Sequence, residues 1–361
     1  MDSLRGVAIL AVVAVHSVTS FSAMGWLPYS IIWAGRYGVD LFFAISGFVL
    51  YHTYRRLEYR SQKPLRVFLL RRWARLAPVY YLGILIYGFV LAESRPDGWQ
   101  SVKSTAFNLT FANGWVPDAA NATVLGGWSI SAEATFGLLF VIIARWISNA
   151  RRAFLFCLIG WVITWQTTEF ISVALAHLAG KESFGSEIIY LPWPYLPTFV
   201  AGIGCWHLWN ARVTAGRSVR LRVRIGCAIA SIGLFLLIPL ELWPNGDRTL
   251  LAGSASALLL YAWSGGSISS WWSWPLGWLG RLSYGTYLIH FAMLGIAQVF
   301  AIGLLPIETP SILLFSATFT LTLAFTIPLA WLSWVCLEQP MHTWIGRITD
   351  AKWHRSPSRG A

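Results

Sequence analysis

Apolar residues fall along this chain in long runs that short polar stretches separate. Windows long enough to span a membrane lie at roughly 5–23, 37–54, 77–92, 126–144, 153–175, 188–209, 225–243, 249–265, 283–304 and 311–336. An α-helix needs about 20 mainly apolar residues to cross the hydrocarbon core of a bilayer. The pattern therefore predicts an all-α, polytopic membrane protein with about ten transmembrane helices.

The composition agrees with a membrane protein. Of the 361 residues, 56% are hydrophobic and 12% are charged, against about 25% charged residues in soluble domains. The chain also has 22 Trp, 21 Phe and 13 Tyr, and aromatic rings anchor helices at membrane interfaces. Its 4 Cys are isolated within apolar runs. Because they have neither disulfide nor metal spacing, we interpret them as core residues and expect no metal.

The formal net charge of +12 is compatible with a nucleic-acid-binding protein, but the positions of the basic residues favour a membrane protein. They form short clusters between the apolar windows. If the N-terminus is cytoplasmic, all but five of the 27 Lys and Arg lie on the inner side, the five being Arg36, Arg95, Lys103, Lys181 and Arg248. The positive-inside rule then places both termini in the cytoplasm, and we expect no nucleic-acid partner.

We divide the chain into a membrane domain, residues 1–340, and a short cytoplasmic tail, residues 341–361. Pro340 provides the stop of the last predicted helix.

The first predicted helix carries one Arg and one His in an otherwise apolar run. Arg5 and His16 are eleven positions apart, about three turns, so they share a face with His16 about 16 Å further along the axis. His16 then lies near the middle of the hydrocarbon, where an ionisable side chain is a candidate functional group. One alternative is that His16 is structural and makes its hydrogen bonds with a neighbouring helix. Another is a cleaved signal peptide, which would discard His16.

A basic loop follows the second window. Within Arg71-Arg72-Trp-Ala-Arg75, Arg72 and Arg75 share a face if the segment is helical, and two guanidinium groups on one face suit phosphate oxygens. Membrane orientation and lipid headgroups also explain a cytoplasmic cluster of this kind.

Carboxyl and hydroxyl groups recur inside two further windows. Asp40 and Ser46 lie in the window 37–54, toward its outer end and near its middle. Glu133 follows Ser129 by one helical turn in the window 126–144. A carboxylate inside a bilayer must find a partner or a proton, so Glu133 is either functional or part of a structural ion pair.

One face of the window 283–304 is polar. Ser283, Tyr287 and His290 lie at i, i+4 and i+7, and His290 is expected at a depth similar to that of His16. This face either lines a substrate path or packs against other helices.

Taken in order, these residues resemble the acyltransferase-3 family of bacterial membrane O-acyltransferases, over nearly the whole chain. The matching motifs are Arg5 to His16, Gly38-Val-Asp-Leu-Phe-Phe-Ala-Ile-Ser-Gly-Phe48, Arg72 with Arg75, Trp128-Ser-Ile-Ser-Ala-Glu133, Ser283-Tyr-Gly-Thr-Tyr-Leu-Ile-His290 and Glu338-Gln-Pro340. Such proteins transfer acetyl or other short acyl groups from acyl-coenzyme A to sugars of lipopolysaccharide, exopolysaccharide, Nod factors or antibiotics. Some carry an additional soluble esterase-like domain, which is not seen here, so we expect this chain to act as the membrane module alone.

The resemblance implies a multi-pass enzyme of the bacterial inner membrane. Its donor would be cytoplasmic acyl-coenzyme A, with acetyl expected, and its acceptor a hydroxyl of a cell-envelope or exported carbohydrate or lipid-linked glycan. Arg72 and Arg75, with Arg5, would hold the donor's phosphates. His16 would deprotonate the hydroxyl or transiently accept the acyl group, with Glu133 orienting or charge-balancing it. The residues expected to face the acceptor are Asp40, Ser46, Tyr287 and His290.

Two other functions remain open from the sequence. A proton-coupled transporter also places His, Asp and Glu within the membrane, although the paired broken helices of an internal repeat are not evident. A non-catalytic scaffold or lipid-binding protein would leave the buried polar groups without a purpose. Solute uptake without a covalent product would favour the transporter, whereas a change in glycan mass would favour the acyltransferase.

Overall fold

The computed structural model describes residues 1–18, 26–92, 102–178, 190–238, 245–264, 273–306 and 309–353. Every regular element within these ranges is helical, which confirms the predicted all-α class. The longer helices are α1 (Asp2–Val18), α3 (Gly38–Arg60), α4 (Pro64–Ala92), α6 (Gly127–Trp146), α7 (Ala150–Leu178), α8 (Leu196–Thr214), α9 (Leu221–Leu237), α10 (Asn245–Ser264), α11 (Ser273–Leu304) and α12 (Ser311–Ser333). Shorter helices are α2 (Trp26–Trp33), α5 (Val102–Leu109) and α13 (Gln339–Trp353), with 3₁₀ turns at Ala34–Tyr37, Asn113–Trp115, Pro117–Ala119 and Trp193–Tyr195.

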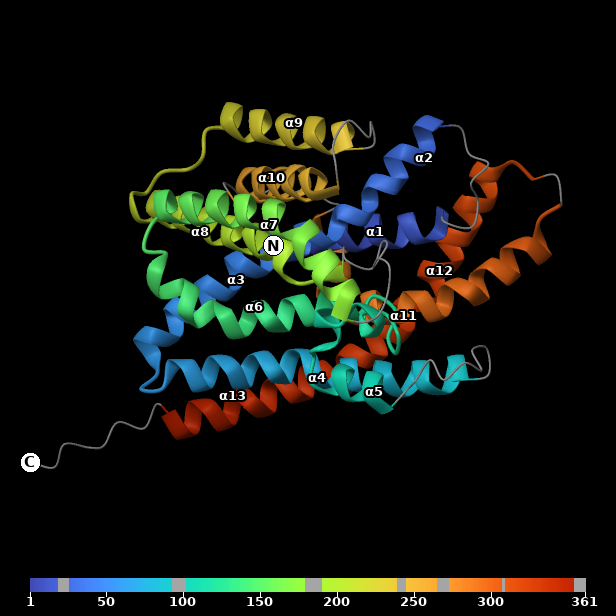
Figure 1. The fold of residues 1–361 in the computed structure, drawn as a ribbon, viewed down its shortest axis with the longest axis horizontal. Helices are drawn as coiled ribbons and strands as arrows, with labels where there is room; N and C mark the ends of the chain where they lie inside the picture. The colour runs from blue at the N-terminus through green and yellow to red at the C-terminus, as the bar shows by residue number, and fades with distance from the viewer. Residues whose placement is uncertain are drawn as a thin grey trace, which may run out of the picture.

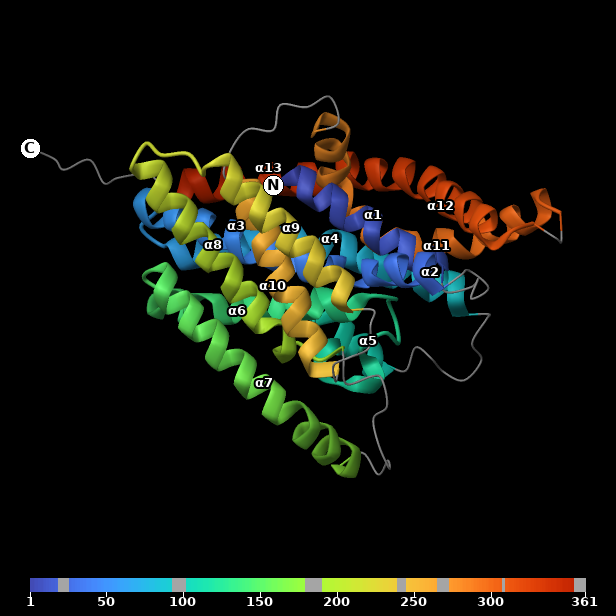
Figure 2. The same ribbon diagram turned by 90° about the horizontal axis from the view of Figure 1, so that it is seen from above.

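Most helices run along the long axis of the molecule (Figure 1), with α9 and α10 at one edge and α4 and α13 at the opposite edge. The view from above places α7 on one face and α12 and α13 on the other (Figure 2). The core lies between them and includes α1 and α3, which contribute fully buried side chains such as Ile9, Val12, Val13 and Ile45.

Each apolar window predicted from the sequence overlaps one of the longer helices. By length and composition, three described segments are able to cross a membrane: Gly127–Trp146, Ser273–Leu304 and Ser311–Thr349. The total number of spans and the side of each terminus stay predictions. Arg95 and Lys181, two of the basic residues predicted on the outer side, lie outside the described residues.

The basic stretch between the second and third windows is helical, so the prediction of a loop there is wrong. α3 continues to Arg60 and α4 already begins at Pro64, so Arg72 and Arg75 lie within α4. Proline favours the first position of a helix, because the N–H that it lacks would be unpaired there. Pro64 was therefore a sequence signal for this early start.

Pro340 does not end the last helix, contrary to the prediction. A π-helical turn at Trp334–Glu338 leads directly into α13, which packs against α4. Because Pro340 lies in the first turn of α13, its missing N–H interrupts no established α-helical ladder. The segment predicted as a tail is thus helical to Trp353, and residues 354–361 lie outside the described residues.

Glycines allow α1 and α11 to approach closely. A Cβ at Gly6 would overlap the main-chain carbonyl of Leu276, and a Cβ at Gly280 would overlap that of Asp2. Further along both helices, the rings of His16 and His290 are 5.3 Å apart. The two helices therefore run side by side in the same direction, with a small-residue crossing of the kind that membrane helices use.

Candidate functional site

A buried ion pair joins α4 to α6. Arg72 Nη2 lies 3.1 Å from Glu133 Oε1 and also donates a hydrogen bond of 2.7 Å to the Glu133 main-chain carbonyl oxygen. Ser46 of α3 donates to the same carboxylate at 2.8 Å. Gly137, one turn after Glu133, leaves the room that Arg72 occupies, because a Cβ there would lie 2.7 Å from Arg72 Nε. Three helices thus meet at one paired charge.

A cavity of about 240 Å³ lies beside this ion pair, and we call it the arginine cavity. Its lining comes from α1, α3, α4, α6 and α13, and its charged side chains are Arg5, Arg71, Arg72, Arg75 and Glu133. Four guanidinium groups against one carboxylate make the cavity a site for an anion, since guanidinium groups bind phosphate and carboxylate oxygens in pairs.

The four arginines differ in what they already bind. Arg5 pairs with Asp2 at 3.3 Å, and Arg71 Nη2 donates to Thr349 Oγ1 of α13 at 3.0 Å. Arg72 is held by Glu133. Arg75 makes no hydrogen bond or ion pair with any residue that the structure describes, so it is the arginine most available to an anion.

A smaller cavity of about 50 Å³, the serine–tyrosine cavity, continues from the arginine cavity. The two share Arg5, Ser46, Arg75 and Glu133. The smaller one extends to hydroxyl groups of α6 and α11, namely Ser129, Ser283, Tyr284 and Tyr287. A polar route therefore leads from the guanidinium groups toward the middle of α11.

A short hydrogen-bond chain closes the far end of this route. Ser129 Oγ donates to Tyr287 Oη at 2.9 Å, and Tyr287 Oη donates to the carbonyl oxygen of Gly126 at 3.1 Å. Gly126 has a φ of 76°, which favours glycine, and a Cβ there would meet Tyr287 Oη. The turn before α6 is thus shaped to accept the Tyr287 hydroxyl.

The imidazole rings of His290 and His16 lie beyond Tyr287. The ring centroid of His290 is 5.7 Å from that of Tyr287 and 5.3 Å from that of His16. Phe291 packs against both imidazoles, with centroid separations of 4.1 Å to His290 and 4.3 Å to His16. The linings of the arginine and serine–tyrosine cavities include neither histidine. Tyr287 therefore separates the imidazole pair from the polar route.

The hydrogen bonding of His290 fixes its tautomer. Its Nδ1 is 2.6 Å from the carbonyl oxygen of Tyr287. Because a carbonyl only accepts, Nδ1 carries the proton, and in a neutral ring Nε2 then has a free lone pair. His290 is fully buried, and Nε2 has no partner among the described residues. The site thus contains a buried acceptor beside His16.

The Glu133 carboxylate binds Arg72 and Ser46 through its Oε1 atom. The predicted role of Glu133 as a partner of the His16 imidazole stays a prediction. Asp40 lies apart from the predicted site. It is 2% exposed at the start of α3, its Oδ1 has no partner among the described residues, and it lines neither of the two cavities.

Two contributors to the arginine cavity are not predicted from the sequence. His342 of α13 lines it, although the sequence pattern predicts a tail after Pro340. Gly137 makes room for Arg72. Its spacing of one turn from Glu133 was the available signal, since a small residue there lets a second helix approach.

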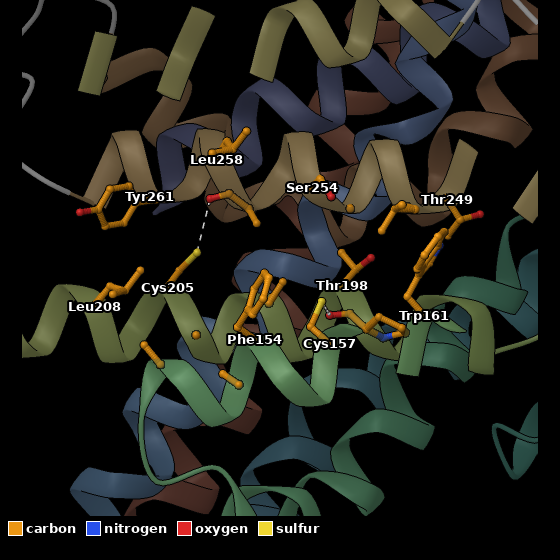
Figure 3. A pocket seen from close by; sticks show the side chains of 18 of the residues that line it. Phe154, Cys157, Trp161, Thr198, Cys205, Leu208, Thr249, Ser254, Leu258 and Tyr261 are labelled. Atoms are coloured by element: carbon orange, nitrogen blue, oxygen red, sulfur yellow. Dashed lines mark hydrogen bonds between the residues drawn. The ribbon is translucent and has the colours of Figure 1, made fainter. Parts of the chain in front are cut away.

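A larger cavity, about 560 Å³, is a different kind of site (Figure 3). It lies between α7, α8 and α10, with Cys227 of α9 at its wall, and we call it the apolar cavity. Its two hydrogen-bonded thiols are satisfied by main-chain carbonyls, Cys157 Sγ donating to Pro197 and Cys205 Sγ to Ala257. Its lining has no charged side chain, so it offers no ion-pair partner to the phosphates of a nucleotide.

Known proteins resemble this chain in sequence. A family described as an acyltransferase domain matches residues 1–332. The peptidoglycan O-acetyltransferase OatA of Listeria monocytogenes is 22% identical over 81% of this chain, which spans about half (49%) of the length of that protein. The exopolysaccharide production protein ExoZ of Rhizobium meliloti is 28% identical over 75% of this chain and 80% of its own length. No solved structure matches.

The Arg72–Glu133 pair generates a prediction about stability. Arg72→Met or Glu133→Leu alone should destabilise the protein by about 3–5 kcal/mol, because each leaves the other charge buried and unpaired. The double substitution should cost clearly less than the sum of the two. Unfolding of the four proteins in detergent, followed by circular dichroism, measures this coupling. Additive losses would contradict a direct pairing of the two side chains.

Proposed function

The chain belongs to the acyltransferase family whose domain matches residues 1–332, and from this we propose that it is a membrane O-acyltransferase. The donor is cytoplasmic acyl-coenzyme A with acetyl as the expected group, and the acceptor is a hydroxyl of a cell-envelope or exported carbohydrate. The observation that carries the proposal is the polar route from an arginine-lined anion cavity toward the buried imidazole of His290 and the half-buried imidazole of His16. Relatives named for peptidoglycan and exopolysaccharide support a glycan acceptor.

The arginine cavity is the proposed site for the phosphates of coenzyme A. Arg75 and Arg5 line both cavities, so they border the entrance of the route. Arg72 is already neutralised by Glu133, and its main task is to hold α4 against α6. Arg75, which has no ion pair among the described residues, then provides the strongest contact to a phosphate oxygen.

The thioester arm would follow the serine–tyrosine cavity to Tyr287. Because this side chain stands between the cavity and the imidazoles, the proposed reaction requires Tyr287 to leave its contact with Ser129 when donor binds. The acyl carbon can then reach the neighbourhood of His16.

His16 is the proposed base. It takes the proton of the acceptor hydroxyl, the oxygen attacks the thioester carbon, the C–S bond breaks, and the coenzyme A thiolate recovers the proton from His16. In the alternative, His16 first accepts the acyl group and passes it to the hydroxyl. In both, the free lone pair of His290 Nε2 accepts a hydrogen bond from the His16 ring and stabilises its charged form.

We propose further that the protein is a multi-pass protein of the bacterial inner membrane, with about ten spans and both termini in the cytoplasm. The same direction of α1 and α11 supports this topology, since the first and ninth predicted spans must cross in the same sense. A proton-coupled transporter is less well supported, because the family match is to acyltransferases.

Removing the proposed base should abolish acyl transfer. His16→Ala should lower acceptor acylation by at least about a hundredfold, the lower range for a general base, and leave membrane insertion unchanged. The measurement is the mass of surface glycans from cells that carry each variant. His52→Ala on α3 is the matched control, and it should keep its acylation. Normal acylation by His16→Ala would remove this assignment.

The role of His290 can be separated from a structural one. Asn reproduces the Nδ1 donor to the Tyr287 carbonyl but has nothing at the place of Nε2, whereas Gln places its amide near Nε2. If Nε2 assists His16, His290→Gln should retain more kcat than His290→Asn, with a shifted pH profile. A structural role in holding the Tyr287 carbonyl would give the reverse order, and thermal unfolding of both variants shows whether folding is involved.

Arg75→Gln tests the phosphate contact. Loss of one charge-assisted hydrogen bond, worth about 1.5–3 kcal/mol, should raise the KM for acyl-coenzyme A roughly ten- to a hundredfold with kcat less affected. Arg66→Gln, at an exposed position of the same helix outside both cavities, is the control. An unchanged KM in Arg75→Gln would contradict the proposed donor site.

A further inference from the structure

The apolar cavity is large, and the proposed reaction does not use it. Figure 3 shows Tyr261 and Leu208 at one end and Trp161 and Thr249 at the other, with the lining drawn from α7, α8 and α10. It is thus an elongated hollow parallel to the helices. Its shape and its apolar walls suit a hydrocarbon chain.

The surroundings of the apolar cavity are also apolar. α7 exposes Phe154 and Ile159 at 68% and 56%, and α9 exposes Ile229 at 64%. In a membrane protein such faces lie against lipid tails rather than water. The apolar cavity therefore opens where hydrocarbon chains are the available ligands.

One end of the apolar cavity is strongly cationic. The Arg212 guanidinium lies 5.4 Å from the ring centroid of Tyr261, a lining residue, and Arg224 Nε donates to the Ala262 carbonyl oxygen at 2.9 Å. The ends of α7, α8, α9 and α10 that meet here belong to sequence segments without Asp or Glu, which carry Arg151, Arg152, Arg212, Arg217, Arg220, Arg222 and Arg224. This end is complementary to a negatively charged headgroup.

We propose that the apolar cavity binds an anionic membrane phospholipid, with one acyl chain between α7, α8 and α10 and the phosphate among the arginines near Tyr261. Basic pockets between membrane helices recognise anionic headgroups, and each arginine near the surface adds to that attraction. The apolar walls provide the affinity for the chain, and the arginines select the headgroup.

This lipid would stabilise the packing of α8 on α3, next to the proposed reaction site. α8 lines the apolar cavity on one side and packs on α3 with the other, where a Cβ at Gly202 would overlap the Ala44 carbonyl and a Cβ at Gly47 would overlap the Phe199 carbonyl. Ser46, which binds Glu133, is the neighbour of Gly47. Filling the cavity behind α8 keeps this contact between α8 and α3 in place.

The test measures lipid that remains on the purified protein. The chain is extracted from membranes, washed in detergent, and its bound phospholipids are quantified by mass spectrometry. Ala257→Phe fills the apolar cavity and should lose the bound phosphatidylglycerol, whereas Ile229→Phe, the same aromatic on an exposed face of α9, should retain it. Arg212→Gln should shift the retained lipid from anionic to zwitterionic species.

A second measurement leaves the chain unaltered, in case Ala257→Phe fails to fold. Delipidated protein should show a higher unfolding midpoint with added phosphatidylglycerol than with the same amount of phosphatidylcholine. Equal midpoints with both lipids, or equal retention by Ala257→Phe and Ile229→Phe, would overturn the proposal. Displacement of the lipid by acyl-coenzyme A would also overturn it, because the cavity would then belong to the donor.

Discussion

The ion pair between Arg72 and Glu133 is the interaction on which the site depends. A charge that is buried among helices must be paired, and this pair is completed by Ser46, so α3, α4 and α6 are fixed relative to one another. The arginine cavity exists because these three helices meet there. Glu133 also keeps the cavity from being purely cationic, so the remaining guanidinium groups can lie close together without an anion bound.

The crossing of α1 and α11 sets the second half of the site. Gly6 and Gly280 bring the two backbones together near their N-terminal ends, and the same direction of both helices keeps His16 and His290 at one level. Antiparallel neighbours would separate these two residues along the axis. Since the helices are far apart in sequence, the pair is formed only when the fold is complete, which ties the chemistry to the correct assembly of the whole bundle.

The sequence predicted the all-α class and the candidate site residues, but it did not predict which residues on other helices those side chains contact. Apolar windows located the longer helices, and the shared face of Ser283, Tyr287 and His290 was visible from spacing alone. The pairing of Glu133 was not predictable, because periodicity describes one helix and says nothing about which other helix faces it. The same limit applies to Asp40, which is buried apart from the cavities. Pro340 misled because a proline stop and a proline in the first turn of a new helix have the same local sequence.

The size of the serine–tyrosine cavity limits how the proposed reaction proceeds. At about 50 Å³ it is much smaller than the arginine cavity of about 240 Å³, so it is the narrow part of the route. The arm can advance only if Tyr287 leaves Ser129, and free energy for that step has to come from differential binding of the donor to the open state. The arginine cavity is the place where such binding arises, because the phosphates contact Arg75 before the acyl group reaches α11.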